Sequence, residues 1–265
     1  MRVRAGVRSD VGRVRRHNED NYLVGRRIWA VADGMGGQAA GDVASSIVIE
    51  RLQVCDAAGP LCQDDLVAAV GAINQAILRY GSDNDEAEGL GSTVCGLASI
   101  SLGQEQDHWA IFHVGDSRVY RYADDLLTRE TVDHSEVEEL IQAGKIDLSQ
   151  ARCHPQRNVL TRSLGQSPPP RPDVLLLPPM AGEVFLICSD GLTSEVSDDQ
   201  IGQVLNGCPD PDQAADRLLR MALEAGGRDN VTVLVLRIEA DDEPGSVETE
   251  RAEDTIPRPD LVVAA

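Results

Sequence analysis

Four aspartates stand where apolar, strand-like runs of this sequence begin or end: Asp33, Asp116, Asp190 and Asp229. Three of them have a glycine directly beside them, which lets backbone and ion approach closely. A single Asp-Gly pair is usually only a turn, but four such positions in one acidic chain predict carboxylates that gather at one edge of the fold. Carboxylates gathered without a counter-charge repel one another, and a divalent cation relieves that repulsion.

The residue types around these aspartates favour a hard cation. Oxygen ligands without His or Cys favour Mg²⁺ or Mn²⁺ over Zn²⁺, and the six cysteines form no Cys-x-x-Cys pair. Gly36-Gly37 are not followed by the Gly-Lys-Ser/Thr of a nucleotide-binding loop, and no cysteine has an arginine six residues on. The pattern therefore gives no support to a cysteine-nucleophile phosphatase.

A charged run near the N-terminus, from Arg15 to Asn21, adds a second kind of group. Alone it is typical of a solvated surface. Beside a metal site, Glu19 and Asp20 could hold metal-bound water, while an arginine binds an anionic substrate through two hydrogen bonds. Metal and arginine together are the groups that phosphoryl transfer uses, because charge on phosphate oxygens must be neutralised.

Short β-branched runs alternate with amphipathic ones, and these elements must position the acids. The patterns predict strands over 27–32, 93–102, 109–114, 118–122, 174–177, 184–188 and 231–238. They predict helices over 42–52, 64–80 and 197–206, and another from Asp210-Pro211 to Gly226-Gly227. Strands come in consecutive groups and helices in pairs, which favours an α+β fold of antiparallel sheets covered by helices. Residues 123–172 are polar, and we expect a mobile excursion from the sheets there.

Composition limits the partners and the compartment. The 265 residues carry 24 Lys plus Arg against 44 Asp plus Glu, a net charge of −20 that disfavours nucleic acid. No run is long and apolar enough for a membrane span, and no secretory signal begins the sequence. We expect reduced, mostly structural cysteines of a cytoplasmic protein, the alternative being a surface disulfide between Cys55 and Cys62. Residues 240–265, with eight acids and two arginines, are expected to be a disordered tail.

Six motifs stand in order along residues 5–239: Arg15-x-x-x-Glu19-Asp20, Ala32-Asp33-Gly34-Met35-Gly36-Gly37, Gly91-Ser92-Thr93, His113-Val114-Gly115-Asp116-Ser117-Arg118, Cys188-Ser189-Asp190-Gly191-Leu192 and Arg228-Asp229-Asn230. With them the chain resembles bacterial members of the PP2C (PPM) family of metal-dependent Ser/Thr protein phosphatases. The resemblance implies a four-layer α-β-β-α sandwich, two antiparallel sheets flanked by helix pairs, as one domain over 1–239. It also implies a flap at about 128–165.

The resemblance assigns roles residue by residue. Asp33 resembles the carboxylate that bridges two metals, and Gly34 the residue whose carbonyl binds the second. Asp190 and Asp229 resemble the remaining ligands of the first metal, and Asp116 a ligand of a third, weaker ion. The implied cofactor is Mn²⁺ or Mg²⁺.

The same resemblance covers the groups around the metals. Arg15 matches the phosphate-binding arginine, with Glu19 and Asp20 as acids behind the metal ligands. Animal relatives have a histidine where this chain has Met35, so the general acid is open between metal-bound water and His154 of the flap. The alternative for His154 is a surface histidine without a role in the reaction.

The implied activity is hydrolysis of phosphoserine and phosphothreonine in proteins by a water activated between two divalent metals. It would reverse a bacterial Ser/Thr kinase in signal transduction, with phosphorylated proteins and the cognate kinase as partners and with neither nucleic acid nor membrane. A monomer is expected. One alternative is an inactive PP2C-like scaffold that binds phosphoproteins, and another is an enzyme that uses the same cleft on a different phosphoester.

Overall fold

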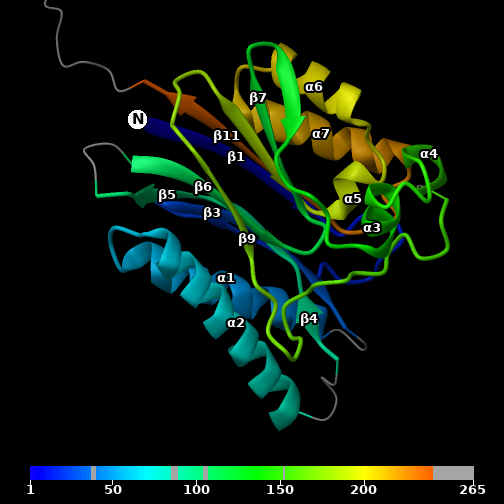
Figure 1. Ribbon diagram of the computed structural model, residues 1–265. Coiled ribbons are helices and arrows are strands. Elements are labelled where there is room, and N and C mark those ends of the chain that lie inside the picture. Colours follow the sequence, from blue (N-terminus) through cyan, green and yellow to red (C-terminus); the bar gives the residue numbers. More distant parts are fainter. Residues whose placement is uncertain (37–39, 85–88, 104–106, 152, 241–265) are drawn as a thin grey trace, which may run out of the picture.

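Two antiparallel sheets stacked face to face form the centre of the protein (Figure 1). The computed structural model describes residues 1–36, 40–84, 89–103, 107–151 and 153–240. One sheet has the order β1 (Arg2–Asp10), β11 (Val231–Glu239), β10 (Val184–Cys188), β7 (Arg118–Ala123), β8 (Leu126–Arg129). The other has the order β2 (Asp20–Val24), β3 (Ile28–Met35), β5 (Val94–Ser101), β6 (Asp107–Val114), β9 (Asp173–Leu177), and β4 (Gly91–Ser92) pairs with β3.

Helices cover the two outer faces of this sandwich. α1 (Gly41–Ala57) and α2 (Gln63–Asp83) lie on the sheet that contains β3, whereas α6 (Asp198–Gly207) and α7 (Pro211–Ala225) lie on the sheet that contains β11 (Figure 1). Shorter helices stand outside these layers: α3 (Glu136–Gln142), α4 (Leu148–Ala151) and α5 (Asp190–Thr193). The predicted four-layer α-β-β-α sandwich is confirmed.

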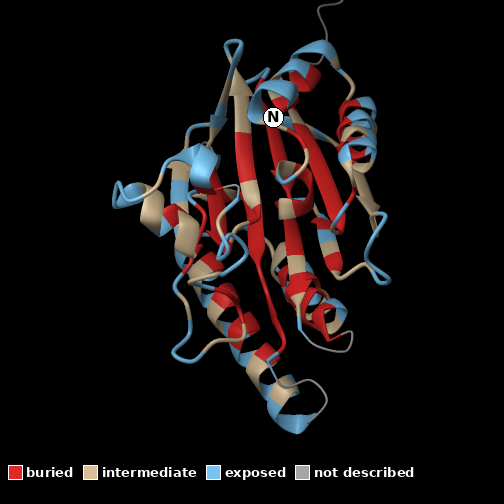
Figure 2. Cartoon of the chain, turned by 90° about the vertical axis from the view of Figure 1, so that its right-hand side faces the viewer, coloured by how far each residue is buried: buried red, intermediate tan, exposed pale blue. Residues whose placement is uncertain are grey.

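Three apolar cores hold the four layers together. One lies between α1, α2 and their sheet, one between α6, α7 and theirs, and one between the two sheets. In the last, Trp29, Trp109 and Phe185 meet edge to face. Figure 2 shows the outcome, with buried strands in the middle and exposed helix faces outside. Strands buried on both sides give the strand ends, where the predicted aspartates stand, a rigid base.

The helix ends follow the sequence signals. Ser197 and Gln200 form the predicted capping box at the start of α6. The Asp210 side chain accepts hydrogen bonds from the backbone N–H groups of Asp212 and Gln213, with Pro211 in the first turn of α7. That helix ends at Gly226, as predicted, because its φ of 155° is accessible to glycine.

Two N-terminal strands were not predicted. β1 pairs with β11 over nine residues, from Arg2 opposite Glu239 to Asp10 opposite Val231. β2 pairs with β3 and sets Asp20 directly opposite Asp33. The first and last strands of the described chain are thus neighbours, and two acids face each other across a strand pair.

The polar excursion at 123–172 contains β8, α3 and α4, and its last part returns to the sandwich through the isolated pairing of Ser92 with Leu164. The flap bounds of 128–165 stay a prediction. All but the first residue of the predicted 240–265 tail lies outside the described residues. All six cysteines are free, so the alternative of a disulfide between Cys55 and Cys62 is absent from the structure. In the described ranges, no helix combines the length and the apolar character that crossing a membrane requires.

Candidate functional site

A pocket of about 380 Å³ gathers most of the predicted site residues. We call it the carboxylate pocket, and its lining is Arg15, Glu19, Asp33, Gly34, Met35, Gly36, Thr93, Asp116, Asn158, Leu160, Ser163, Gln166, Asp190, Asp229 and Asn230. All four strand-end aspartates are present, as the sequence pattern predicted. Asp20 is absent from the lining and is buried behind it.

Backbone hydrogen bonds fix Asp33 at the end of β3. Its N–H donates to Thr93 Oγ1 (3.0 Å), while its carbonyl accepts from Thr93 N–H (2.8 Å) and from Ser92 Oγ (3.0 Å). Thr93 Oγ1 also lies 2.7 Å from Ser117 Oγ, beside Asp116. One threonine therefore links the backbone of Asp33 to the loop that carries Asp116.

Two glycines allow neighbouring segments to touch. A Cβ at Gly34 would lie 1.9 Å from the Gly41 carbonyl oxygen, and one at Gly191 would lie 1.9 Å from that of Asn230. The sequence pattern predicted that these glycines let an ion approach closely. The structure supplies a different reason, close backbone packing, which in the second case brings the start of α5 with Asp190 against the residue that follows Asp229.

Arg15 lies on a loop that Asn230 holds in place. The Asn230 side chain accepts from Glu19 N–H (2.8 Å) and donates to the carbonyls of Val11 and His17 (both 2.9 Å). Arg15 Nη2 donates to Asp229 Oδ2 at 2.8 Å. The bond uses one nitrogen, so the other N–H groups of this guanidinium are not engaged by Asp229.

Burial and mutual repulsion disfavour the ionised forms of three of the pocket's aspartates, Asp33, Asp116 and Asp190. Desolvation first, and then the charges of neighbouring carboxylates, raise the pKa of Asp33 and of Asp116 well above the ordinary value. The same causes raise the pKa of Asp190 to about 6, against the opposing effect of Arg118 and Arg15. With this chain's own side chains alone, the pocket therefore has more negative charge than it can stabilise.

Asp20 gives a second sign of missing positive charge. Its Oδ2 accepts a 2.7 Å hydrogen bond from Ser189 Oγ, yet its Oδ1 is buried without a partner among the described residues. Burial, partly offset by the hydrogen bonds, raises the pKa of Asp20 to about 7. An unsatisfied carboxylate oxygen behind a set of crowded carboxylates fits the donor chemistry of a divalent cation with oxygen ligands.

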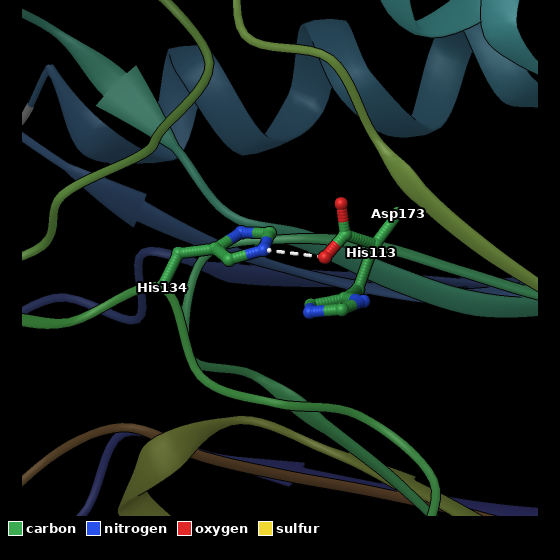
Figure 3. Close-up of side chains that lie close together, drawn as sticks. All are labelled: His113, His134 and Asp173. Carbon is green, nitrogen blue, oxygen red and sulfur yellow. Dashed lines mark hydrogen bonds and ion pairs between the residues drawn. The ribbon is translucent and has the colours of Figure 1, made fainter. Parts of the chain in front are cut away.

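Two histidines and an aspartate beside the pocket form a cluster that does not suit a metal (Figure 3). His134 Nδ1 accepts from Gly115 N–H (3.1 Å), and Nε2 lies 3.1 Å from Asp173 Oδ2. The rings of His113 and His134 stack with centroids 4.5 Å apart and planes 16° apart. Because a ring nitrogen binds a metal in the plane of its ring, one ion cannot satisfy two stacked rings. The cluster instead fixes Gly115, the residue before Asp116.

The structure does not bring His154 into the carboxylate pocket. Its Nδ1 accepts from Gln156 N–H at 3.2 Å, and it is absent from the lining. Met35, which stands where animal relatives have a histidine, does line the pocket. Sequence reasoning missed the positioning side chains of Asn230 and Ser189. Their signal was available, because each sits directly beside a predicted ligand in a quoted motif.

A family model of protein phosphatase 2C matches residues 13–228. The serine/threonine protein phosphatase PstP of Mycobacterium tuberculosis is 40% identical over 239 residues, which cover 88% of this chain and 44% of PstP. This chain therefore spans less than half the length of that relative. The serine/threonine phosphatase stp of Listeria innocua is 34% identical over 88% of this chain and 95% of its own length.

A solved structure gives the same result for the fold. The catalytic domain of PstP in complex with two manganese ions superposes with a TM-score of 0.82 at 37% identity, over 90% of this chain and 99% of that one. The likeness extends over both sheets and the helices that cover them, and the relative binds divalent cations of the kind that the crowded carboxylates here suit.

Proposed function

This chain belongs to the protein phosphatase 2C family, and we propose that it hydrolyses phosphoserine and phosphothreonine in proteins with divalent cations. The observation that carries the proposal is the carboxylate pocket, where half-buried aspartates from four separate segments meet beside Arg15. The names of the relatives support an active phosphatase over the inactive scaffold.

We assign the divalent ions to Asp33, Asp190 and Asp229, with the Gly34 carbonyl as a further ligand. Asp116 is our candidate for a third, weaker ion. When bound, the ions supply neutralisation of phosphate charge and a lowered pKa for the attacking water. The cation in the cell is proposed to be Mn²⁺ or Mg²⁺.

The residues of the chain itself orient the substrate. Arg15 reaches the pocket from the loop that Asn230 anchors, and its free N–H groups can donate to two phosphate oxygens. Glu19 lines the pocket with its carboxylate against the first residue of α1, and Asp20 is buried behind it; we propose both as acceptors for ordered water. The pocket contains no Ser, Thr or Cys paired with a base among its described lining residues, which agrees with direct attack by water.

The remaining proposals concern the proton donor, the partners, the oligomeric state and the compartment. Because His154 lies outside the carboxylate pocket, we propose water as the source of the proton for the leaving oxygen, with His154 as the alternative side chain. The proposed partners are phosphorylated proteins and a Ser/Thr kinase whose action is reversed, and the proposed state is a monomer. Six free thiols fit a reducing compartment, so we propose the cytoplasm.

Turnover of a phosphothreonine peptide in Mn²⁺ tests the proposal. We expect hydrolysis that ceases in excess chelator and in Asp190→Ala. Binding of the phosphopeptide without any turnover would favour the scaffold instead. Faster turnover of a nucleotide or small phosphomonoester than of any phosphopeptide would favour another phosphoester, and activity in chelator would reject the metal assignment.

A further inference from the structure

A second and larger pocket adjoins the carboxylate pocket, and the proposed chemistry does not use it. It encloses about 790 Å³, within the range of small-molecule and side-chain binding sites. We call it the arginine pocket, and its lining is Thr161, Arg162, Gln166, Ser167, Pro168, Pro169, Pro170, Arg171 and Asp173. Gln166 lines both pockets, so whatever occupies one lies next to whatever occupies the other.

Residues 164–166 form the wall between the two pockets, and hydrogen bonds hold this wall in place. The fully buried Asn74 of α2 accepts from the N–H groups of Gly165 (2.7 Å) and Gln166 (3.2 Å), and it donates to the Gln166 carbonyl (3.0 Å). Leu164 exchanges two backbone hydrogen bonds with Ser92, whose hydroxyl in turn donates to the Asp33 carbonyl. The arginine pocket therefore keeps a fixed distance from the aspartates at which phosphate would be cleaved.

The charge of the arginine pocket is opposite to that of its neighbour. Arg162 Nη1 donates to Asp173 Oδ1 at 3.0 Å, and Asp173 also bonds His134. Arg171 is exposed, and no acidic side chain of the described chain makes an ion pair with it. In a protein with a net charge of −20, an unpaired guanidinium in a hollow beside the site is a specific feature of this surface.

The lining also suits a side chain better than a free ion. Three consecutive prolines have fixed φ angles and no N–H to donate, so that wall is stiff and offers apolar contact. The charged donors of the lining are the two arginines, whose planar guanidinium groups match carboxylate and phosphate. A Lys or Arg of a substrate would meet these two guanidinium groups against the single carboxylate of Asp173, which Arg162 already pairs.

Resting on the phosphatase function proposed above, we propose that the arginine pocket binds an anionic side chain of the same phosphoprotein, a few residues from the phosphoserine or phosphothreonine. Arg171 makes the main contact, and Arg162 contributes from its pair with Asp173. The protein would then prefer substrates that carry acidic or additional phosphorylated residues near the cleaved phosphate.

Four phosphothreonine peptides test this with the Mn²⁺-loaded full chain. The four are identical except for one position, which holds Gln, Lys, Glu or a second phosphothreonine. The set of four is made again with that position moved one residue at a time along the peptide. We expect kcat/KM to exceed that of the Gln peptide by about fivefold for Glu, the upper end for an exposed ion pair, and by more for phosphate because of its greater charge. A gain with phosphate alone would identify multiply phosphorylated proteins as the source.

Charge reversal at the pocket supplies the control. Arg171→Glu should reduce the Glu:Gln ratio of kcat/KM to about one or below, with Arg171→Gln as a milder second variant. Arg51→Glu, on the exposed face of α1, changes the net charge equally and should keep the ratio. Dissociation constants of the unphosphorylated product peptides should change in parallel and weaken with added salt.

The outcomes separate the two proposals. If no peptide and no small phosphomonoester is hydrolysed, the phosphatase function fails. If all peptides are hydrolysed with equal kcat/KM, or if Arg171→Glu and Arg51→Glu alter the ratio equally, the arginine pocket has no part in substrate choice and the inference is overturned.

Discussion

The carboxylate pocket and the arginine pocket share Gln166, yet they draw their charged groups from different kinds of structure. Most of the aspartates stand at the ends of strands or beside them, on a base buried by three cores. The arginines stand on the irregular segment between 160 and 172. Rigid elements hold crowded charges that would otherwise separate, whereas exposed arginines need no such restraint. We therefore expect substitutions in the first pocket to affect chemistry and those in the second to affect substrate choice.

The largest effect should come from Asp33→Asn. This change keeps the shape of the side chain and removes the charge that the other aspartates surround, so we expect kcat to fall by about a thousandfold, the size of a lost transition-state contact. Steady-state kinetics in saturating Mn²⁺ measures it. Asp83→Asn, at the exposed end of α2, is the matched control and should leave kcat unchanged. A loss of kcat of less than tenfold in Asp33→Asn would contradict the expectation that the carboxylate pocket governs the chemical step.

Arg15→Ala should have the next largest effect, and on a different parameter. Losing charge-assisted hydrogen bonds to phosphate should raise KM for a phosphopeptide about tenfold or more. Mn²⁺ affinity, measured by calorimetry, should change less, because Arg15 touches Asp229 through a single nitrogen in an exposed pair. An unchanged KM would remove Arg15 from the phosphate site.

The shared wall offers a test of both pockets at once. Asn74→Ala leaves the Gly165 and Gln166 N–H groups without their buried acceptor, so we expect the free energy of unfolding to fall by about 2 kcal/mol. The preference between anionic and neutral peptides should weaken in the same variant. Gln75→Ala, the exposed neighbour on α2, should change stability by no more than about 0.5 kcal/mol in chemical denaturation. Equal behaviour of the two variants would mean that Asn74 does not hold the wall.

The prediction with the least bearing on activity is a pH dependence of the stability of the metal-free protein. Burial raises the folded-state pKa of Asp20 to about 7 and that of Asp190 to about 6, from 3.8. At pH values between the unfolded-state pKa and these raised pKa values, the folded state binds more protons than the unfolded state. The free energy of unfolding therefore falls as pH rises from about 4 to 7. Thermal melting in chelator should show Tm lower by about 7 °C or more at pH 7 than at pH 5. Mn²⁺ should restore Tm at pH 7, and a Tm that rises with pH in chelator would contradict the prediction.

The sequence was sufficient for the parts of the fold with strong local signals. The helices at 41–57, 63–83 and 198–207 begin within one residue of their predicted starts, because apolar spacing and caps mark them. β1 went unpredicted although Val3, Ala5 and Val7 pack against the core between the sheets, because no continuous β-branched run marks that segment. β2 was hidden because it opens within a charged run.

The candidate site could be predicted as a set of residues but not as an arrangement. Strand-end positions identified the aspartates. That Asp20 lies opposite Asp33 depends on the register in which β2 pairs with β3, and the residue pattern alone does not give that register. No sequence pattern predicted that Arg171 and Gln166 line a pocket. Their position depends on where the segment around 166 packs, and Asn74, more than ninety residues earlier in the chain, fixes that segment by hydrogen bonds.

The pairing of β1 with β11 determines when the carboxylate pocket can first form in a chain that is being synthesised. Arg2 is paired with Glu239, so at about 5–20 residues per second the first strand waits between about ten seconds and a minute for β11, its sheet neighbour among the described strands. Asp229 and Asn230 immediately precede that last strand. A ribosome-bound chain that stops short of β11 therefore lacks the strand that holds Asp229 and Asn230 in place, and it should acquire Mn²⁺ only after β11 has emerged.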